Sequence, residues 1–186
     1  MSTTYFHEFP SPIGSLLLVS NDDSLTGLYM TDHSGGPERQ SAWQRDESRF
    51  AEVCEQLAAY FAGNLRNFDV PVEPAGTEFQ LKVWNELRQI PYGETISYGE
   101  LARRIDQPAA SRAVGRANGQ NPISIIIPCH RVIGSNGTLT GYGGGLDRKR
   151  WLLDHEGAVP ESHKVHPDAA SRIRKETVQT LAFDAE

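Results

Sequence analysis

The stretch NPISIIIPCHRV, residues 121–132, carries the strongest structural signals in the chain. Its Asn-Pro start interrupts regular structure, because proline lacks a backbone donor and restricts the residue before it. Residues 123–127, four isoleucines and one serine, then predict a buried strand or extended segment. That segment delivers Cys129 and His130, so the fold presents a nucleophile and a base side by side.

Cys129 is a candidate nucleophile, since an ionised cysteine is the softest nucleophile among the side chains. His130 follows it directly, and Glu156 lies further along the chain. If the fold brings the three together, the carboxylate can orient the imidazole, which takes the thiol proton directly or through a water. A Cys-His dipeptide taken alone is more often a core thiol beside a capping histidine. A metal site is favoured less, because adjacent residues lack the usual ligand spacing.

Residues 77–90 predict an amphipathic helix upstream of this stretch. Thr77 and Gln80 form a capping box, in which each side chain satisfies a free backbone amide of the other. Apolar side chains then recur on one face, and a Pro-Tyr-Gly turn ends the pattern. Ser97 and Glu100 form a second capping box, which predicts the start of another helix.

Two short helices, near residues 97–105 and 109–117, are separated by about three turn residues, which favours a helix-turn-helix. Similar helix pairs also occur in purely structural helical cores. The second helix is poor in long side chains, and only Arg112 and Arg116 project far from it. Because base edges are usually read by Arg, Asn or Gln, this helix fits recognition of shape better than recognition of sequence.

A glycine-rich loop, residues 134–145, follows the Cys129 stretch, and a helix is predicted over residues 147–155. Glycines let backbone amides approach a ligand closely, although a flexible surface loop has the same composition. The loop lacks the Lys-Ser or Lys-Thr pair of a phosphate-binding P-loop. A bound nucleotide cofactor is therefore not expected, and no other cofactor is predicted.

The N-terminal part predicts a small α/β unit. Residues 14–30 alternate apolar runs with an Asn-Asp-Asp turn, which is typical of a β-hairpin. Residues 47–62 show helical spacing. The expected fold class is an α/β N-terminal domain with a small antiparallel sheet and a helix, followed by a mostly α C-terminal domain containing a helix-turn-helix. The expected boundaries are 1–70 for the N-terminal domain, 71–76 for a linker, 77–157 for the second domain and 158–186 for a polar tail.

Composition and charge limit the class of protein. Among 186 residues, 38% are hydrophobic, and no apolar run is long enough to cross a bilayer. No secretory signal is visible either. We therefore expect a cytoplasmic monomer with no membrane partner and no obligate protein partner. The net charge is −6, yet residues 78–155 carry ten Lys and Arg against seven Asp and Glu. The other residues carry eight against seventeen. The second domain can therefore bind DNA through a few phosphate contacts.

Four stretches in order resemble a known family. They are IPYGETISYGELA (90–102), SRAVG (111–115), NPISIIIPCHRV (121–132) and GYGGGLDRKRWLLDHEG (141–157). Together they resemble the O6-alkylguanine-DNA alkyltransferases, also called methylated-DNA–protein-cysteine methyltransferases. The resemblance covers residues 77–157 and, more loosely, the N-terminal part. It implies single-turnover repair of double-stranded DNA containing O6-alkylguanine, without a cofactor, and leaves O4-alkylthymine open as a second substrate.

The resemblance also implies roles for individual residues at the reacting centre. Cys129 is the alkyl acceptor, and His130 and Glu156, together with water, generate its thiolate. Tyr98 matches the tyrosine that donates a proton or hydrogen bond to the departing guanine. These four residues form the expected catalytic set.

Other matched residues are implied to hold the DNA after the nucleotide has rotated out of the duplex. Arg112 matches an arginine that enters the base stack in place of the extruded nucleotide. Asn121 matches a hinge asparagine between the recognition helix and the active-site strand, and Tyr142 and Gly143 lie in a loop whose backbone closes over the flipped base. Further contacts to the DNA are expected from Ser97 and Ser111. Arg116 departs from the family, which often has a small residue there, and its longer side chain is expected to add a phosphate contact.

Some family members hold a structural zinc in the N-terminal part. Here that part offers only Cys54 as a thiol, with His7 and His33, so we expect no metal. Three other classes remain open: a non-catalytic lesion-binding protein, a helix-turn-helix regulator and a cysteine hydrolase. The presence of Cys129 argues against the first, the absence of an added sensor domain against the second, and single turnover would exclude the third.

Overall fold

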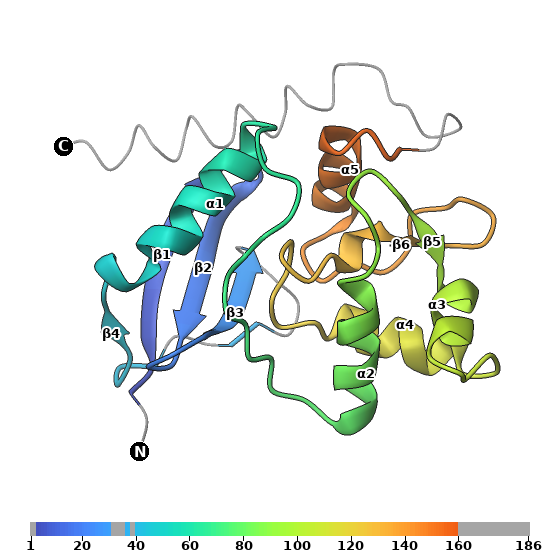
Figure 1. Ribbon diagram of the computed structural model, residues 1–186, viewed down its shortest axis with the longest axis horizontal. Helices are drawn as coiled ribbons and strands as arrows, with labels where there is room; N and C mark the ends of the chain where they lie inside the picture. The colour runs from blue at the N-terminus through green and yellow to red at the C-terminus, as the bar shows by residue number, and fades with distance from the viewer. Residues whose placement is uncertain (1–2, 31–35, 38–39, 160–186) are drawn as a thin grey trace.

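The computed structural model describes residues 3–30, 36–37 and 40–159 (Figure 1). The tail expected from residue 158 onward lies outside the described residues except for its first two positions. None of the helices in the described segments combines the length and apolar character that a membrane crossing requires.

A four-stranded sheet forms most of the N-terminal half, with the strand order β3-β2-β1-β4. The hairpin predicted over residues 14–30 is confirmed, because β2 and β3 pair antiparallel. Strand β1 adds an antiparallel neighbour that was not predicted, and the two-residue β4 pairs parallel to β1. The strands are β1 (Tyr5–Ser11), β2 (Gly14–Ser20), β3 (Leu25–Met30) and β4 (Gln44–Arg45).

Helix α1 (Ala51–Phe61) covers one face of this sheet, as Figure 1 shows. A 3₁₀ turn, η1 (Ser48–Phe50), leads into it, so the helix predicted over residues 47–62 is confirmed with a later start. Val53, Leu57 and Tyr60 form its buried face, at the helical spacing seen in the sequence.

Within described residues 78–159, the four α-helices α2 to α5 gather beyond β3, as Figure 1 shows. The capping box of Thr77 and Gln80 is confirmed, since both reciprocal hydrogen bonds are present. The second box is only half formed: Ser97 Oγ accepts from the Glu100 amide, but the Glu100 carboxylate turns to two arginines instead. The elements are α2 (Glu78–Leu87), α3 (Tyr98–Arg104), α4 (Ser111–Gly119), α5 (Leu146–His155) and a two-stranded parallel sheet of β5 (Ile96–Ser97) and β6 (Val132–Ile133).

Helices α3 and α4 form the predicted helix pair, with a longer connection than expected. The second helix begins at Ser111, two residues later than predicted, so residues 105–110 form the turn. Asp106 lies there in the left-handed region, with φ of 59°. Trp84 of α2 donates from its indole nitrogen to the Ala117 carbonyl at 2.9 Å, which fixes α4 against the core.

The stretch that carries Cys129 is buried as predicted, but it is not a regular strand. Only Ile123 forms a bridge, with Leu28 at the edge of the N-terminal sheet. Ile125 adopts a φ of 71°, and the amide of Ile127 returns to the Ile123 carbonyl at 3.0 Å. The segment therefore turns back on itself, and the 3₁₀ turn η2 (Cys129–Arg131) follows directly.

Candidate active site

Asn121 shapes the segment that precedes Cys129. Its side-chain amide donates to the carbonyls of Ile123 and Ile127 at 3.3 and 2.8 Å, and its oxygen accepts from the Ile123 amide at 3.0 Å. Asn118, at the end of α4, donates to the Cys129 carbonyl at 3.3 Å. Buried amide side chains at and just after the end of α4 are therefore bonded to the segment that carries Cys129, and the hinge role of Asn121 stays a prediction.

Glu156 lies at the centre of a buried network at the end of α5. His130 Nε2 lies 2.9 Å from its Oε1, and the guanidinium of Arg131 donates to Oε2 and Oε1 at 2.8 and 3.0 Å. Arg131 also donates to the Ile90 carbonyl at 2.7 Å. The carboxylate is thus held by a bidentate arginine, which fixes the plane in which His130 meets it.

The charges in this network follow from burial and from these contacts. Burial alone would raise the pKa of Glu156, but the charges and hydrogen bonds of His130 and Arg131 hold that pKa well below its usual range. Burial lowers the pKa of His130, although Glu156 opposes the shift. A carboxylate only accepts, so the neutral imidazole carries its proton on Nε2. The His130 Nδ1 atom, which is buried without a partner among the described residues, is then free to accept a proton.

The Cys129 thiol is 4% exposed, and burial raises its pKa, while a hydrogen bond from Asn121 and the charge of Lys149 oppose that rise. Lys149 is itself fully buried, and its Nζ donates to the carbonyls of Val132 and Thr140 at 2.6 and 2.8 Å. Burial lowers the pKa of Lys149 to about 8, with Cys129 opposing. The thiol is therefore protonated at rest, and it needs a base to become a nucleophile.

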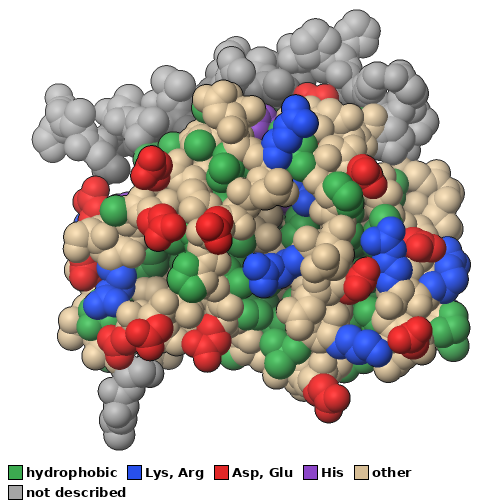
Figure 2. All heavy atoms as spheres, viewed as in Figure 1, with side chains coloured by type: hydrophobic (Ala, Val, Ile, Leu, Met, Phe, Trp, Pro, Cys, Tyr) green, Lys and Arg blue, Asp and Glu red, His purple; other side chains and the backbone are tan. Residues whose placement is uncertain are grey.

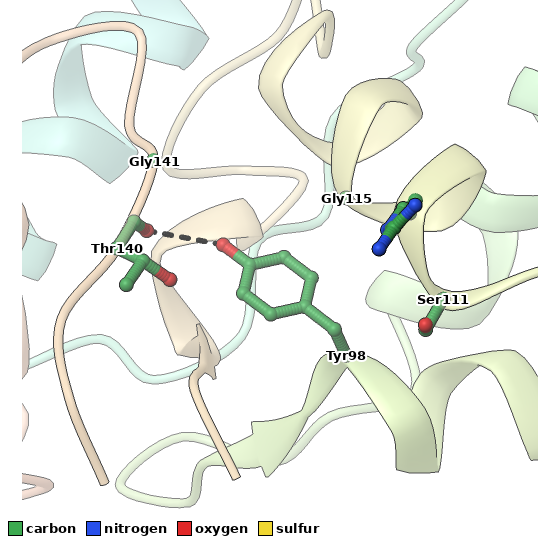
Figure 3. Close-up of a pocket in the computed structure, with 6 residues that line it drawn as sticks. Tyr98, Ser111, Gly115, Thr140 and Gly141 are labelled. Atoms are coloured by element: carbon green, nitrogen blue, oxygen red, sulfur yellow. Dashed lines mark hydrogen bonds between the residues drawn. The ribbon is translucent and has the colours of Figure 1, made fainter. Parts of the chain in front are cut away.

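A pocket of about 300 Å³ opens between α3, α4 and the glycine-rich loop. Figure 3 shows the ring of Tyr98 between Gly115 of α4 and the loop, with its hydroxyl donating to the Thr140 carbonyl at 3.0 Å. An added Cβ at Gly115 would lie 3.5 Å from that ring, which is an ordinary van der Waals contact, so α4 runs directly beside Tyr98. The lining is completed by Ser111, Arg112 and Gly141.

Two expected DNA contacts, Arg112 and Arg116, are exposed one turn apart on α4. Neither has a hydrogen-bond or ion-pair partner in the part of the chain that the structure describes. In Figure 2 the acidic side chains are most frequent over the N-terminal half, whereas most Lys and Arg side chains lie over the helical half. The free arginines therefore project from the less acidic half of the protein.

The loop beside the pocket is held against the N-terminal half. Tyr142 and Gly143 are half-buried, and burial, together with the nearby Cys129, raises the pKa of the Tyr142 hydroxyl well above its usual value. Arg148 donates to the Gly144 carbonyl at 3.0 Å and to the Ile13 carbonyl at 2.8 Å. The loop expected to close over a base is thus tied to the turn between β1 and β2.

The structure joins His130, the chain neighbour of Cys129, to Glu156, and Tyr98 and Arg112 line one pocket. Ser111 lines it too, but the Ser97 hydroxyl is engaged as the cap of α3.

Three groups near the site were missed from the sequence. Arg131 lies inside the quoted motif, so its position was a usable signal, whereas Lys149 stands in the charged run DRKR and Tyr60 in the distant α1. Nothing local in the sequence distinguishes those two from surface and core residues.

The chain matches both domains of one family. Residues 78–158 match the 6-O-methylguanine DNA methyltransferase, DNA binding domain, and residues 3–74 match the ribonuclease-like domain of the same family. A methylated-DNA–protein-cysteine methyltransferase of Methanosarcina acetivorans is 53% identical over 154 residues, which is 83% of this chain and 99% of the relative. The protein of that name from Mycolicibacterium paratuberculosis is 57% identical over 143 residues, 77% and 86% of the two chains.

A solved structure agrees with these matches. The crystal structure of Mycobacterium tuberculosis OGT in complex with DNA superposes with a TM-score of 0.78 at 50% identity, covering 84% of this chain and 96% of that one. Identity of this level over nearly the full length of each relative extends through both halves of the fold. The chain therefore belongs to the 6-O-methylguanine DNA methyltransferase family, whose curated members are the methylated-DNA–protein-cysteine methyltransferases.

Proposed function

We propose that this protein repairs double-stranded DNA directly, by moving the alkyl group of O6-alkylguanine onto the sulfur of Cys129. One observation carries the assignment to this residue. Cys129 is followed by a neutral, buried imidazole whose Nε2 is bonded to Glu156 and whose Nδ1 is left as an acceptor. This is the arrangement that a protonated, buried thiol needs to ionise.

In the proposed reaction the thiol proton passes to His130 Nδ1, directly or through a water. The Cys129 sulfur then attacks the alkyl carbon, so that the S–C bond forms while the O6–C bond breaks and its electron pair remains on guanine. Guanine gains one proton as it leaves, which balances the proton lost by the thiol. Tyr98, whose hydroxyl lies at the pocket beside the loop, either passes a proton to guanine or donates a hydrogen bond while solvent supplies the proton. His130 then releases the thiol proton to Tyr98 or to solvent, so both residues end the reaction neutral.

The remaining roles concern access to the base. An alkyl carbon inside a duplex cannot reach the sulfur of a cysteine residue that is only 4% exposed, so the nucleotide must rotate out of the stack. Arg112 is proposed to fill the vacated space, and Ser111 and Arg116 to contact the neighbouring backbone. We propose a cytoplasmic location as well, because Cys54 and Cys129 are both free thiols and such thiols persist in a reducing compartment.

Intact mass spectrometry after incubation with a duplex containing one O6-methylguanine tests the function. We expect a gain of one methylene unit per protein, mapped to Cys129, with Cys54 unmodified and no gain in Cys129→Ser. A lesion-binding protein or a regulator would bind the duplex and keep its mass. A cysteine hydrolase would release product beyond one equivalent of protein. Either of those results would overturn the proposal.

Methylation of Cys129 is expected to destabilise the protein. The sulfur is buried among packed side chains, and an extra methyl group in a tightly packed interior costs about 1–3 kcal/mol. The thioether also removes the ionisable thiol whose charged form Asn121 and Lys149 favour. Thermal unfolding of the free and methylated forms should show a lower Tm for the methylated form, and identical curves would contradict the expectation.

A further inference from the structure

Tyr60 joins the N-terminal half of the protein to the carboxylate of Glu156. It lies near the end of α1, is fully buried, and its hydroxyl donates to Glu156 Oε1 at 2.7 Å. Its own carbonyl faces His155 Nε2 at 2.7 Å. The residue is therefore held at its backbone by His155, the last residue of α5, and at its side chain by Glu156, which follows the helix.

The hydroxyl of Tyr60 contacts the same carboxylate oxygen that His130 uses. Glu156 Oε1 receives Tyr60 at 2.7 Å, His130 at 2.9 Å and one Arg131 nitrogen at 3.0 Å, whereas Oε2 receives the other Arg131 nitrogen at 2.8 Å. Arg131 alone would already fix the plane of the carboxylate. A further donor on Oε1 competes with His130 for the electron density of the same oxygen.

We propose that Tyr60 is a positioning residue of the cysteine-activating network, whose hydroxyl shares Glu156 Oε1 with His130 and so keeps the imidazole neutral and ready to accept the thiol proton. The inference rests on the proposed function of Cys129, because it gives that reaction a contribution from the N-terminal half. It assigns to Tyr60 no contact with DNA or with the reacting atoms.

The charges that face His130 and Glu156 determine in which direction Tyr60 shifts the pKa of His130. Glu156 is the group that favours a protonated imidazole, while burial and the positive charges of Arg131 and Lys149 oppose it. A hydrogen bond from Tyr60 neutralises part of the negative charge on Oε1. If that bond is removed, Oε1 accepts more strongly from His130, and the pKa of His130 rises.

The other ionisable groups near this network come from several elements. Cys129 precedes His130 in η2, and Tyr142 of the glycine-rich loop and Tyr92 of the turn after α2 both face the Glu156 charge. Burial raises the pKa of Tyr60 far above its usual value, and the charge of Glu156 raises it further. The Tyr60 hydroxyl therefore stays protonated at any accessible pH. Tyr60 therefore always acts as a donor.

Tyr92 provides a matched control within the same aromatic cluster. Its ring lies 6.2 Å from that of Tyr60, edge to face, and its hydroxyl donates to the His155 carbonyl at 3.3 Å rather than to the carboxylate. Tyr60→Phe and Tyr92→Phe each remove one hydroxyl and keep the ring. A purely structural role for the cluster would give both variants the same behaviour.

The test measures the His130 titration by NMR of the full-length protein labelled on histidine, and the single-turnover rate of methyl transfer from O6-methylguanine duplex against pH. In Tyr60→Phe we expect the His130 midpoint and the acid limb of the rate profile to move upward together by roughly half a pH unit. The rate difference from wild type should be largest at low pH. Tyr92→Phe should match the wild type in both measurements.

An unmoved His130 midpoint in a folded Tyr60→Phe, or an equal shift in Tyr92→Phe, would overturn the inference. The NMR titration does not depend on catalysis, so it decides the role of Tyr60 even if Cys129 were never methylated. A Cys129 that is never methylated would instead overturn the proposed function. The two failures are therefore distinguishable.

Discussion

The Glu156→Gln protein is expected to unfold with a free energy about 3–5 kcal/mol lower than that of the wild type, because one partner of a buried ion pair is lost. Arg131 and Glu156 are each only 6% exposed, and the guanidinium makes two of its three hydrogen bonds to this carboxylate. Glutamine keeps the shape but leaves the buried positive charge without a counter-ion. Its amide also places a donor against Arg131 or His130, which are donors themselves.

The same substitution is expected to slow methyl transfer by roughly 10²- to 10⁴-fold, the range in which positioned acid–base groups contribute. Without the carboxylate, His130 loses the partner that holds its proton on Nε2 and leaves Nδ1 as the acceptor. Chemical denaturation and single-turnover kinetics measure the two effects. Glu55→Gln, an exposed change on α1, serves as the control. Wild-type stability together with a wild-type rate in Glu156→Gln would contradict the role of the network.

The pH dependence of stability gives a further test of the ion pair between Glu156 and Arg131, because the direction of the change with pH is defined. The pKa of Glu156 is depressed in the folded protein, so its contribution is fully present above the unfolded value, near 4.3, and is lost as the pH falls toward the folded value. As the pH falls below about 5, protonation of Glu156 should therefore reduce the stability of the wild type. The Glu156→Gln protein lacks that group, and its stability should fall less steeply over the same interval.

Local chemistry explains which parts of the fold were predictable. The capping box of Thr77 and Gln80 and the β2–β3 hairpin depend on neighbours within a few residues, so their patterns are legible in the sequence. The isoleucine-rich residues 123–127 were correctly placed in the interior, but periodicity does not distinguish an extended segment from a turn. The left-handed conformation of Ile125 depends on Asn121 and on docking against β3, which are tertiary contacts.

The site was predictable only as far as the motif extends. Cys129, His130 and Glu156 follow from residue types whose chemistry is known and from the resemblance of the surrounding stretches. Tyr60 contacts the site from 96 residues away, so no local pattern could reveal it. Lys149 is similarly hidden, because a lysine between two arginines indicates a solvated helix face until the fold buries it.

Replacing Arg112 with alanine is expected to slow repair of duplex DNA by about 10- to 100-fold, since rotating a nucleotide out of the stack costs a few kcal/mol. Arg112 is exposed on α4, lines the same pocket as Tyr98 and has no partner among the described residues. An arginine that occupies the vacated space stabilises only the flipped state. Its loss should therefore leave the transfer from free O6-methylguanine base to Cys129 nearly unchanged.

Arg116→Ala separates this effect from general attraction to DNA. Arg116 is exposed one turn along α4, outside the lining of the pocket, so a phosphate contact is the role that its position allows. Its loss should weaken duplex binding and reduce the salt dependence of affinity by about one unit of slope, without singling out the flipped state. Single-turnover rates at saturating duplex compare the two variants. If Arg112→Ala loses no more rate than Arg116→Ala, or slows the free base equally, then Arg112 does not act in nucleotide flipping.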